Sequence, residues 1–216
     1  MQEQHFLNKL VVLLAMIISG YADATTIDFN FLTQNRTAYT DYPGGITNQG
    51  FRITNSADSL FSFGATSIYN LDPGGATLSA SKGFSSTTLT RADGGSFDFV
   101  SIDFGDPYGT AQLWENSGVY TYMFEFTHTN GLTDLSSISV PFSTRDANGM
   151  VTYSPLKTFS FDEQNLRAVS WNATNMYGYW QADNVVLSTV PEPNSLALML
   201  CGIALILGIG SWAHAH

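Results

Sequence analysis

The sequence predicts an all-β domain, specifically an antiparallel β-sandwich of jelly-roll type. Short segments in which apolar and polar residues alternate recur along the chain, and turn-forming residues separate them about every ten residues. Away from the two ends, no stretch keeps a helical apolar period for three turns. Many short strands at regular spacing are typical of sandwiches and jelly rolls.

Two segments give the clearest strand signals. Within 96–104 the apolar phase switches at Val100 and Ser101, which predicts a bulge or a bend between two sheets. Within 119–128 the aromatic residues share one face, which predicts a long half-buried strand. We expect a first strand at 27–31, and further strands at 51–53, 60–63, 67–69, 87–90, 138–142, 159–161, 169–171 and 185–187. Pro and Gly predict turns at 41–45, 72–75 and 92–95.

The first 24 residues have the pattern of a signal peptide. Lys9 precedes a short apolar core, and Ala22 and Ala24 supply the small residues that signal peptidase needs. We therefore expect cleavage after Ala24 and a β-sandwich domain over residues 25–189. The alternative is a buried N-terminal helix.

The last 27 residues, 190–216, combine a Pro-Glu-Pro triplet (Pro191, Glu192 and Pro193) with an apolar run. The run has no charged residue, and at about 1.5 Å per residue it is long enough to cross the membrane hydrocarbon. We expect a transmembrane helix at 195–213; the alternative is burial of this run inside the domain.

This segment resembles a PEP-CTERM sorting domain, in which a Pro-Glu-Pro motif precedes a transmembrane helix and a short basic tail. The resemblance implies a bacterial exported protein that is a substrate of a membrane-embedded exosortase, with cleavage near the triplet. The chain departs from the pattern after the helix, where His214, Ala215 and His216 stand in place of basic residues. A basic tail would orient the helix, so its absence leaves open a permanently membrane-anchored surface protein.

Composition excludes some functions. The chain carries 18 acidic and 8 basic residues with no basic cluster, so we expect no nucleic-acid binding. The only cysteine, Cys201, lies in the C-terminal apolar run, so the domain has no disulfide and no thiol nucleophile.

The acidic and histidine side chains give weak catalytic signals. His128 is the sole histidine of the domain and stands beside a turn, without a G-x-S-x-G motif. Glu115, Glu125 and Glu163 show no spacing typical of a carboxylate pair. We therefore expect no enzyme; the alternative is a secreted hydrolase of polysaccharides or esters.

Two binding sites are suggested. Structural calcium is the only cofactor that the sequence supports, and its candidate ligands are the carboxylates of Asp28, Asp103, Asp106 and Asp183, against the simpler reading of ordinary turn aspartates. Tyr177, Tyr179 and Trp180 could stack on sugar rings from a loop before the last strand, against the alternative of core packing.

Together these observations predict an exported, non-catalytic β-sandwich. The precursor is expected to face the periplasm from the inner membrane, and the processed domain to reach the cell surface or extracellular matrix. Its expected partners are an exosortase-type enzyme and exopolysaccharide.

Overall fold

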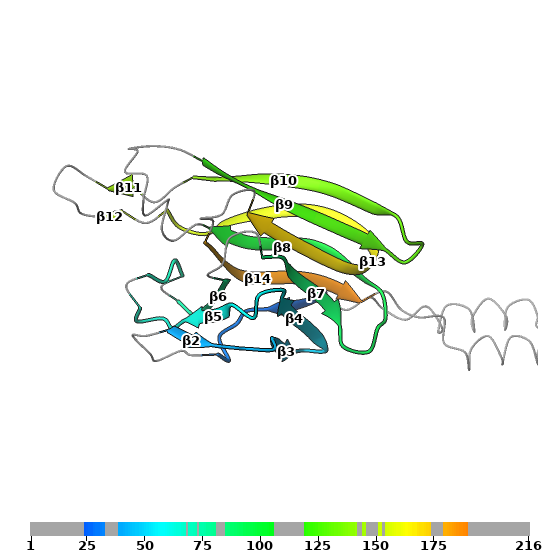
Figure 1. Ribbon diagram of the computed structural model, residues 1–216, viewed down its shortest axis with the longest axis horizontal. Helices are drawn as coiled ribbons and strands as arrows, with labels where there is room; N and C mark the ends of the chain where they lie inside the picture. Colours follow the sequence, from blue (N-terminus) through cyan, green and yellow to red (C-terminus); the bar gives the residue numbers. More distant parts are fainter. Residues whose placement is uncertain are drawn as a thin grey trace, which may run out of the picture. The chain divides into compact units, whose positions relative to one another are not determined.

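Every regular element that the structure describes is a β-strand (Figure 1). The computed structural model describes residues 24–32, 39–67, 69–72, 74–80, 85–105, 119–141, 144–145, 151–152, 154–173 and 179–189. The strands are β1 Ala24–Ile27, β2 Tyr39–Asp41, β3 Ile46–Asn48, β4 Phe51–Asn55, β5 Leu60–Phe63, β6 Thr77–Ala80, β7 Thr87–Arg91, β8 Phe97–Gly105, β9 Val119–His128, β10 Thr133–Pro141, β11 Thr144–Arg145, β12 Val151–Thr152, β13 Lys157–Ala173 and β14 Trp180–Thr189. Ala24–Thr189 form one compact unit.

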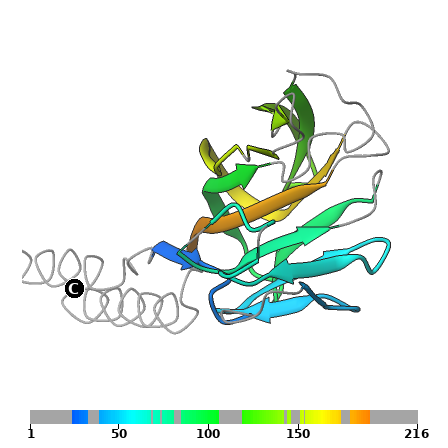
Figure 2. The ribbon, with the colours of Figure 1, turned by 90° about the vertical axis from the view of Figure 1, so that its left-hand side faces the viewer.

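All strand pairs are antiparallel, and β13 joins the two halves of the large sheet. The first half runs β2-β5-β6-β14-β8, with β1 also paired to β14, and β8 pairs with the first part of β13 (Figure 2). The second part of β13 pairs with β9 on one side and with β7 on the other. β9 pairs in turn with β10, and β7 pairs with β4, which pairs with β3. β11 and β12 form a separate two-stranded sheet.

The bend predicted at Val100 is confirmed. The pairing of β8 with β14 shifts register between Ser101 and Phe99, where β8 has one more residue than its partner. The pairing of β8 with β13 shifts there as well, and β13 carries two residues with positive φ, Asp162 at 56° and Asn165 at 55°. These irregularities bend β13 where it passes from one half of the sheet to the other.

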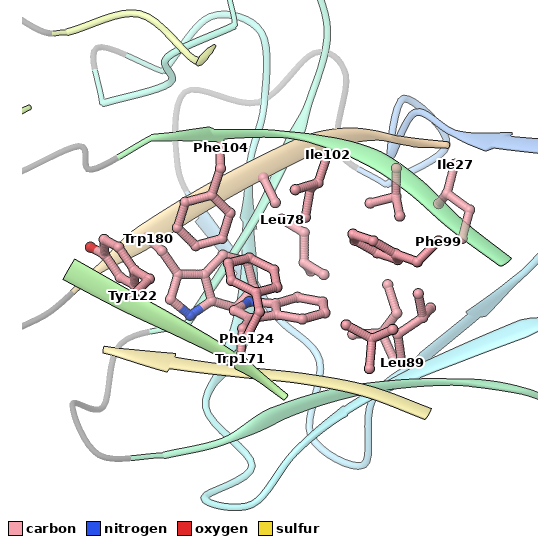
Figure 3. Close-up of a cluster of buried hydrophobic side chains, with 14 of the residues drawn as sticks. Ile27, Leu78, Leu89, Phe99, Ile102, Phe104, Tyr122, Phe124, Trp171 and Trp180 are labelled. Atoms are coloured by element: carbon pink, nitrogen blue, oxygen red, sulfur yellow. The ribbon is translucent and has the colours of Figure 1, made fainter. Parts of the chain in front are cut away.

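Aromatic side chains from the two halves meet in a single core (Figure 3). The rings of Phe104 in β8 and Phe124 in β9 lie 5.7 Å apart although these strands are not hydrogen-bonded neighbours. Trp171 of β13 and Trp180 of β14 are in edge contact at 5.4 Å. The alternation predicted for 119–128 is confirmed, because Tyr120, Tyr122, Phe124 and Phe126 are all buried.

Most predicted strands are confirmed, with extensions, and two predictions are wrong. The segments 159–161 and 169–171 belong to one long strand, β13, and 138–142 overlaps the end of β10. The first strand ends at Ile27 because Phe29 has a φ of 49°, which breaks extended structure. Ser67 and Tyr69 do not belong to a strand: the Ser67 N–H donates to the Gly64 carbonyl, and the Asn70 N–H donates to the Ser67 carbonyl.

The ends of the chain lie outside the described residues. This applies to Ala22, to the triplet Pro191, Glu192 and Pro193, and to the apolar run at 195–213. Within the described residues there is no helix of the length and apolarity needed to cross a membrane. Ala24 begins β1 and pairs with Ser188.

Candidate functional site

The carboxyl of Asp183 is a buried acidic group with an unsatisfied oxygen. Asp183 lies in β14 and is 2 % exposed, and its Oδ1 has no hydrogen-bond partner. Burial, with further contributions from the neighbouring carboxyls of Asp72 and Asp28, raises the pKa of Asp183 to about 8, and the backbone N–H of Asn184 opposes the shift. A buried carboxyl beside two others is an unfavourable arrangement unless something compensates for it.

The turn after β1 brings Asp28 and Asn30 to this position. Positive φ at Phe29 turns the chain away from β14, and the Leu32 N–H donates to the Phe29 carbonyl at 2.9 Å. The Asn30 N–H donates to Asp28 Oδ1 at 3.2 Å. Both side chains are half-buried, so their oxygens are held beside the domain surface.

The loop between β5 and β6 brings Asp72. The N–H of Gly74 donates to Asp72 Oδ1 at 3.0 Å, and the N–H of Ala76 donates to Asn30 Oδ1 at 3.0 Å, so this loop is bonded to the turn after β1. A Cβ at Gly75 would lie 1.9 Å from Asn30 Oδ1 and 2.8 Å from Asp72 Oδ2. The two oxygens therefore pack closely against Gly75, and a side chain at this position would displace them. We call Asp28, Asn30, Asp72 and Asp183 the Asp183 cluster.

The side-chain amides of Gln181, which lies in β14, and of Asn70 hold the β5–β6 loop in place by hydrogen bonds. Gln181 is fully buried, and its Oε1 accepts hydrogen bonds from the Leu71 N–H and the Thr77 hydroxyl, both at 2.9 Å. Its Nε2 donates to the Tyr69 carbonyl. Asn70 Nδ2 donates to the carbonyls of Asp72 and Gly75, each at 2.7 Å. The position of Asp72 therefore depends on well-bonded side chains.

The calcium ligands expected from the sequence are only partly brought together. Asp28 and Asp183 are neighbours, whereas the carboxylate of Asp103 is occupied by the Thr158 hydroxyl and by Asn184 Nδ2 at 2.9 Å. Asp106 lies outside the described residues. Asp72 and Asn30 were missed, because Asp72 was read only as part of a turn and Asn30 as part of a strand.

The three residues predicted to stack on sugars differ in how far the structure exposes them. Trp180 is wrong as a candidate, because it is 2 % exposed and its ring stacks on Phe104 at 5.7 Å inside the core. Tyr179 is half-buried and its carbonyl accepts a hydrogen bond from the Tyr122 hydroxyl, while Tyr177 lies outside the described residues. Tyr69, which the sequence did not single out, is 39 % exposed and lies 6.0 Å from the buried ring of Phe63.

Among the described residues, one group of three acidic or histidine side chains has ligand atoms that all lie within 4.8 Å of one another. It comprises His128, Asp134 and Glu163, here called the His128 cluster. His128 Nε2 lies 2.9 Å from Asp134 Oδ2, and Nδ1 lies 3.0 Å from the Gln164 carbonyl. Both ring nitrogens are therefore engaged, and neither is left to activate a serine hydroxyl. Glu125 lies exposed on β9, and Glu115 lies outside the described residues.

No family model and no curated protein matches the chain. Solved structures similar to it include the CBM22-1 xylan-binding domain from Paenibacillus barcinonensis, at 11 % identity and a TM-score of 0.36 over 81 % of this chain and 99 % of that one. A carbohydrate-binding module of family 29 has 11 % identity and a TM-score of 0.39, covering 79 % and 90 %. The K1 cleaved adhesin domain of Lys-gingipain from Porphyromonas gingivalis W83 has 10 % identity and a TM-score of 0.42, covering 73 % and 100 %. Likeness of this degree does not identify a ligand for this chain.

Proposed function

We propose that this chain is an exported, non-catalytic β-sandwich of jelly-roll type that binds polysaccharide at the cell envelope or in the extracellular matrix. The observation that carries the binding role is the exposed side chain of Tyr69, whose backbone is hydrogen-bonded on the β5–β6 loop. The backbone N–H of Tyr69 donates a hydrogen bond to Ser67 Oγ at 3.3 Å, and its carbonyl accepts one from the buried Gln181 side chain. Because the backbone at Tyr69 is held by these bonds, stacking of the ring on a sugar requires less ordering of the chain.

Delivery to the envelope is supported by the sequence at the two ends. The signal-peptide pattern precedes residue 25, and the Pro-Glu-Pro triplet follows the last residue of β14, Thr189, by one residue. We propose that an exosortase-type enzyme acts on this C-terminal segment in the inner membrane and that the domain then moves to the surface or the matrix.

Affinity electrophoresis in gels that contain soluble polysaccharides tests the binding role on the full-length chain in mild detergent. We expect Tyr69→Ala to lose retardation by the polysaccharide that retards the parent protein. Leu135→Ala is the matched control, because Leu135 is exposed but lies on the β9–β10 hairpin. If no polysaccharide at millimolar sugar concentration retards the parent, the binding role is wrong.

Intact-mass measurement and cell fractionation in the native host test the sorting role. We expect a mature protein that begins near Thr25, ends near the triplet and leaves the membrane fraction. A membrane-bound species that retains residues 195–213 would instead identify a permanently anchored protein.

A further inference from the structure

We propose that the Asp183 cluster binds one calcium ion, and that this ion ties the turn after β1 and the β5–β6 loop to the last strand, β14. The three segments are far apart in sequence, and each contributes at least one side-chain oxygen. The site uses none of the side chains of the proposed sugar binding, although Tyr69 and Asp72 lie on the same loop between β5 and β6.

The first argument is the unsatisfied oxygen. Asp183 Oδ1 is buried and has no hydrogen-bond donor. Among the described residues, Thr40 Oγ1 and Trp171 Nε1 are also buried without a partner, but neither belongs to a carboxyl. A buried carboxyl oxygen without a donor costs free energy that the fold must offset. A cation beside Oδ1 would remove this cost. Protonation is the alternative, because a protonated Asp183 carboxyl shares a hydrogen bond with the carboxyl of Asp72, and the titration below distinguishes the two.

The second argument is the local charge. Asp72 and Asp28 both act electrostatically on Asp183, although the carboxylate oxygens of the three do not all lie within 4.8 Å of one another as those of the His128 cluster do, so an ion would have to draw them together. Among the described residues, the ion pairs are Arg91 with Asp93 and His128 with Asp134, and neither includes a member of the cluster. A divalent cation supplies the positive charge that no side chain in these pairs brings to the cluster.

The third argument is the chemistry of the ligand atoms. The cluster offers carboxylate oxygens and the amide oxygen of Asn30, which suit a hard cation and do not suit the softer metals that prefer imidazole or thiolate. Ligands drawn from a turn, a loop and a strand form an irregular set. Calcium accepts six to eight oxygens in flexible geometry, whereas magnesium requires a near-ideal octahedron and retains several waters. Calcium is therefore the expected ion.

The absence of a side chain at residue 75 fits this assignment. Gly75 is buried, and a Cβ there would overlap the space that Asn30 Oδ1 and Asp72 Oδ2 face. Gly75 does not need its glycine for a positive φ, because only Gly44, Gly45, Gly50, Gly94 and Gly131 have one among the described glycines. Close approach of the two oxygens to the backbone is then what glycine permits.

The test is calorimetric titration of the chelator-treated, full-length protein in mild detergent with calcium chloride, and in parallel with magnesium chloride. We expect one calcium ion per chain, a Kd of about 10⁻³ M or tighter, and at least about tenfold weaker binding of magnesium. Thermal unfolding followed by circular dichroism should shift to higher temperature with calcium.

Asp183→Asn and Asp72→Asn are the decisive variants, and Asp134→Asn is the matched control in the His128 cluster. We expect each decisive variant to weaken calcium binding by about 100-fold, since it removes a charged ligand, and the control to change it by less than about threefold. Gly75→Ala should weaken calcium binding as the decisive variants do, because its methyl group would displace Asn30 Oδ1 and Asp72 Oδ2.

Asp183→Asn also gives a readout that loss of a structural contact would not give. In chelator the variant should unfold at the same temperature as the parent or higher, because a neutral amide replaces a crowded carboxyl. In about 10 mM calcium the order should reverse. The proposal is overturned if calcium gives no binding heat and no thermal shift in the parent, if Asp134→Asn weakens binding as much as Asp183→Asn, or if magnesium binds more tightly than calcium.

Discussion

The Asp183 cluster and the His128 cluster each gather acidic side chains, but they differ in burial and in how their polar atoms are satisfied. In the Asp183 cluster the central carboxyl is buried and one oxygen has no partner. In the His128 cluster Asp134 is exposed, and both imidazole nitrogens of His128 already have partners. Crowded acids alone therefore do not identify a ligand site; an unsatisfied buried oxygen does.

The two clusters also differ in the hydrogen bonds and strands that position their side chains. Buried amides of Gln181 and Asn70 fix the loop that carries Asp72. The His128 cluster depends on a hairpin end and on the irregular part of β13 near Glu163. Substitutions in the two regions should therefore have effects of different size.

The largest effect is expected for Gln181→Leu. This change leaves the Leu71 N–H and the Tyr69 carbonyl without their buried partner, so we expect a loss of about 3 kcal/mol in the free energy of unfolding. Urea denaturation measures it. Gln164→Leu, at an exposed position beside His128, is the control and should change stability by about 0.5 kcal/mol or less. Equal losses of free energy of unfolding in the two variants would contradict the expected difference in stability between the two regions.

The next effect concerns amide exchange when calcium is removed. The N–H groups of Ala76 and Leu132 both donate to asparagine Oδ1 atoms, those of Asn30 and Asn130. At calcium concentrations about tenfold above Kd, chelation should accelerate exchange at Ala76 by about tenfold. Exchange at Leu132 should stay constant. Hydrogen exchange followed by mass spectrometry separates the two peptides, and acceleration at both would show a global effect.

A third effect is the pH dependence in the absence of divalent cations. Asp183 has a pKa of about 8 in the folded state and an ordinary value of 3.8, so between these values the folded state holds a proton that the unfolded state has released. The contribution of Asp183 to stability is therefore largest at low pH and falls as pH rises from about 4 to about 8. Urea denaturation of the parent and of Asp183→Asn in chelator should show a steeper fall in the parent. Identical slopes would contradict the shift.

The smallest effect is expected for His128→Ala. The pair with Asp134 is partly exposed, and such pairs contribute about 1 kcal/mol or less. The loss measured by urea denaturation should shrink when salt is raised to about 1 M, because salt screens exposed charges. A loss that is independent of salt would instead indicate that packing of the imidazole ring matters more than its charge.

The sequence was sufficient for the all-β class and for most strands because alternation and turn residues are local signals. The alternating aromatics of 119–128 predicted β9, and the phase switch at Val100 predicted the bulge in β8. β6 was missed because Thr77–Ala80 is only 4 residues long and Leu78 is its one large apolar side chain, although the strand is buried on both faces. The first strand was misplaced because no local feature of the sequence predicts the positive φ of Phe29, which ends the strand.

The Asp183 cluster was only half predictable. Asp28 and Asp183 could be paired in advance because first and last strands are often neighbours, and Asp72 could not, since loop-to-strand contacts depend on the three-dimensional path of the chain. The same limit applies to Trp180, whose position after a turn-like segment suggested exposure. Its ring instead fills the core between Phe104 and Trp171.

The pairing of β1 with β14 has a mechanical consequence. Ala24 lies opposite Ser188 and Ile27 opposite Val185, so the two ends of the domain emerge side by side. Tension between those ends would peel the strand pairs apart one after another, starting at Ala24, instead of shearing all of them together. Asp28 comes directly after the last pair, so an ion held there would stop the peeling at the point where β1 has been detached and the rest of the domain is still intact.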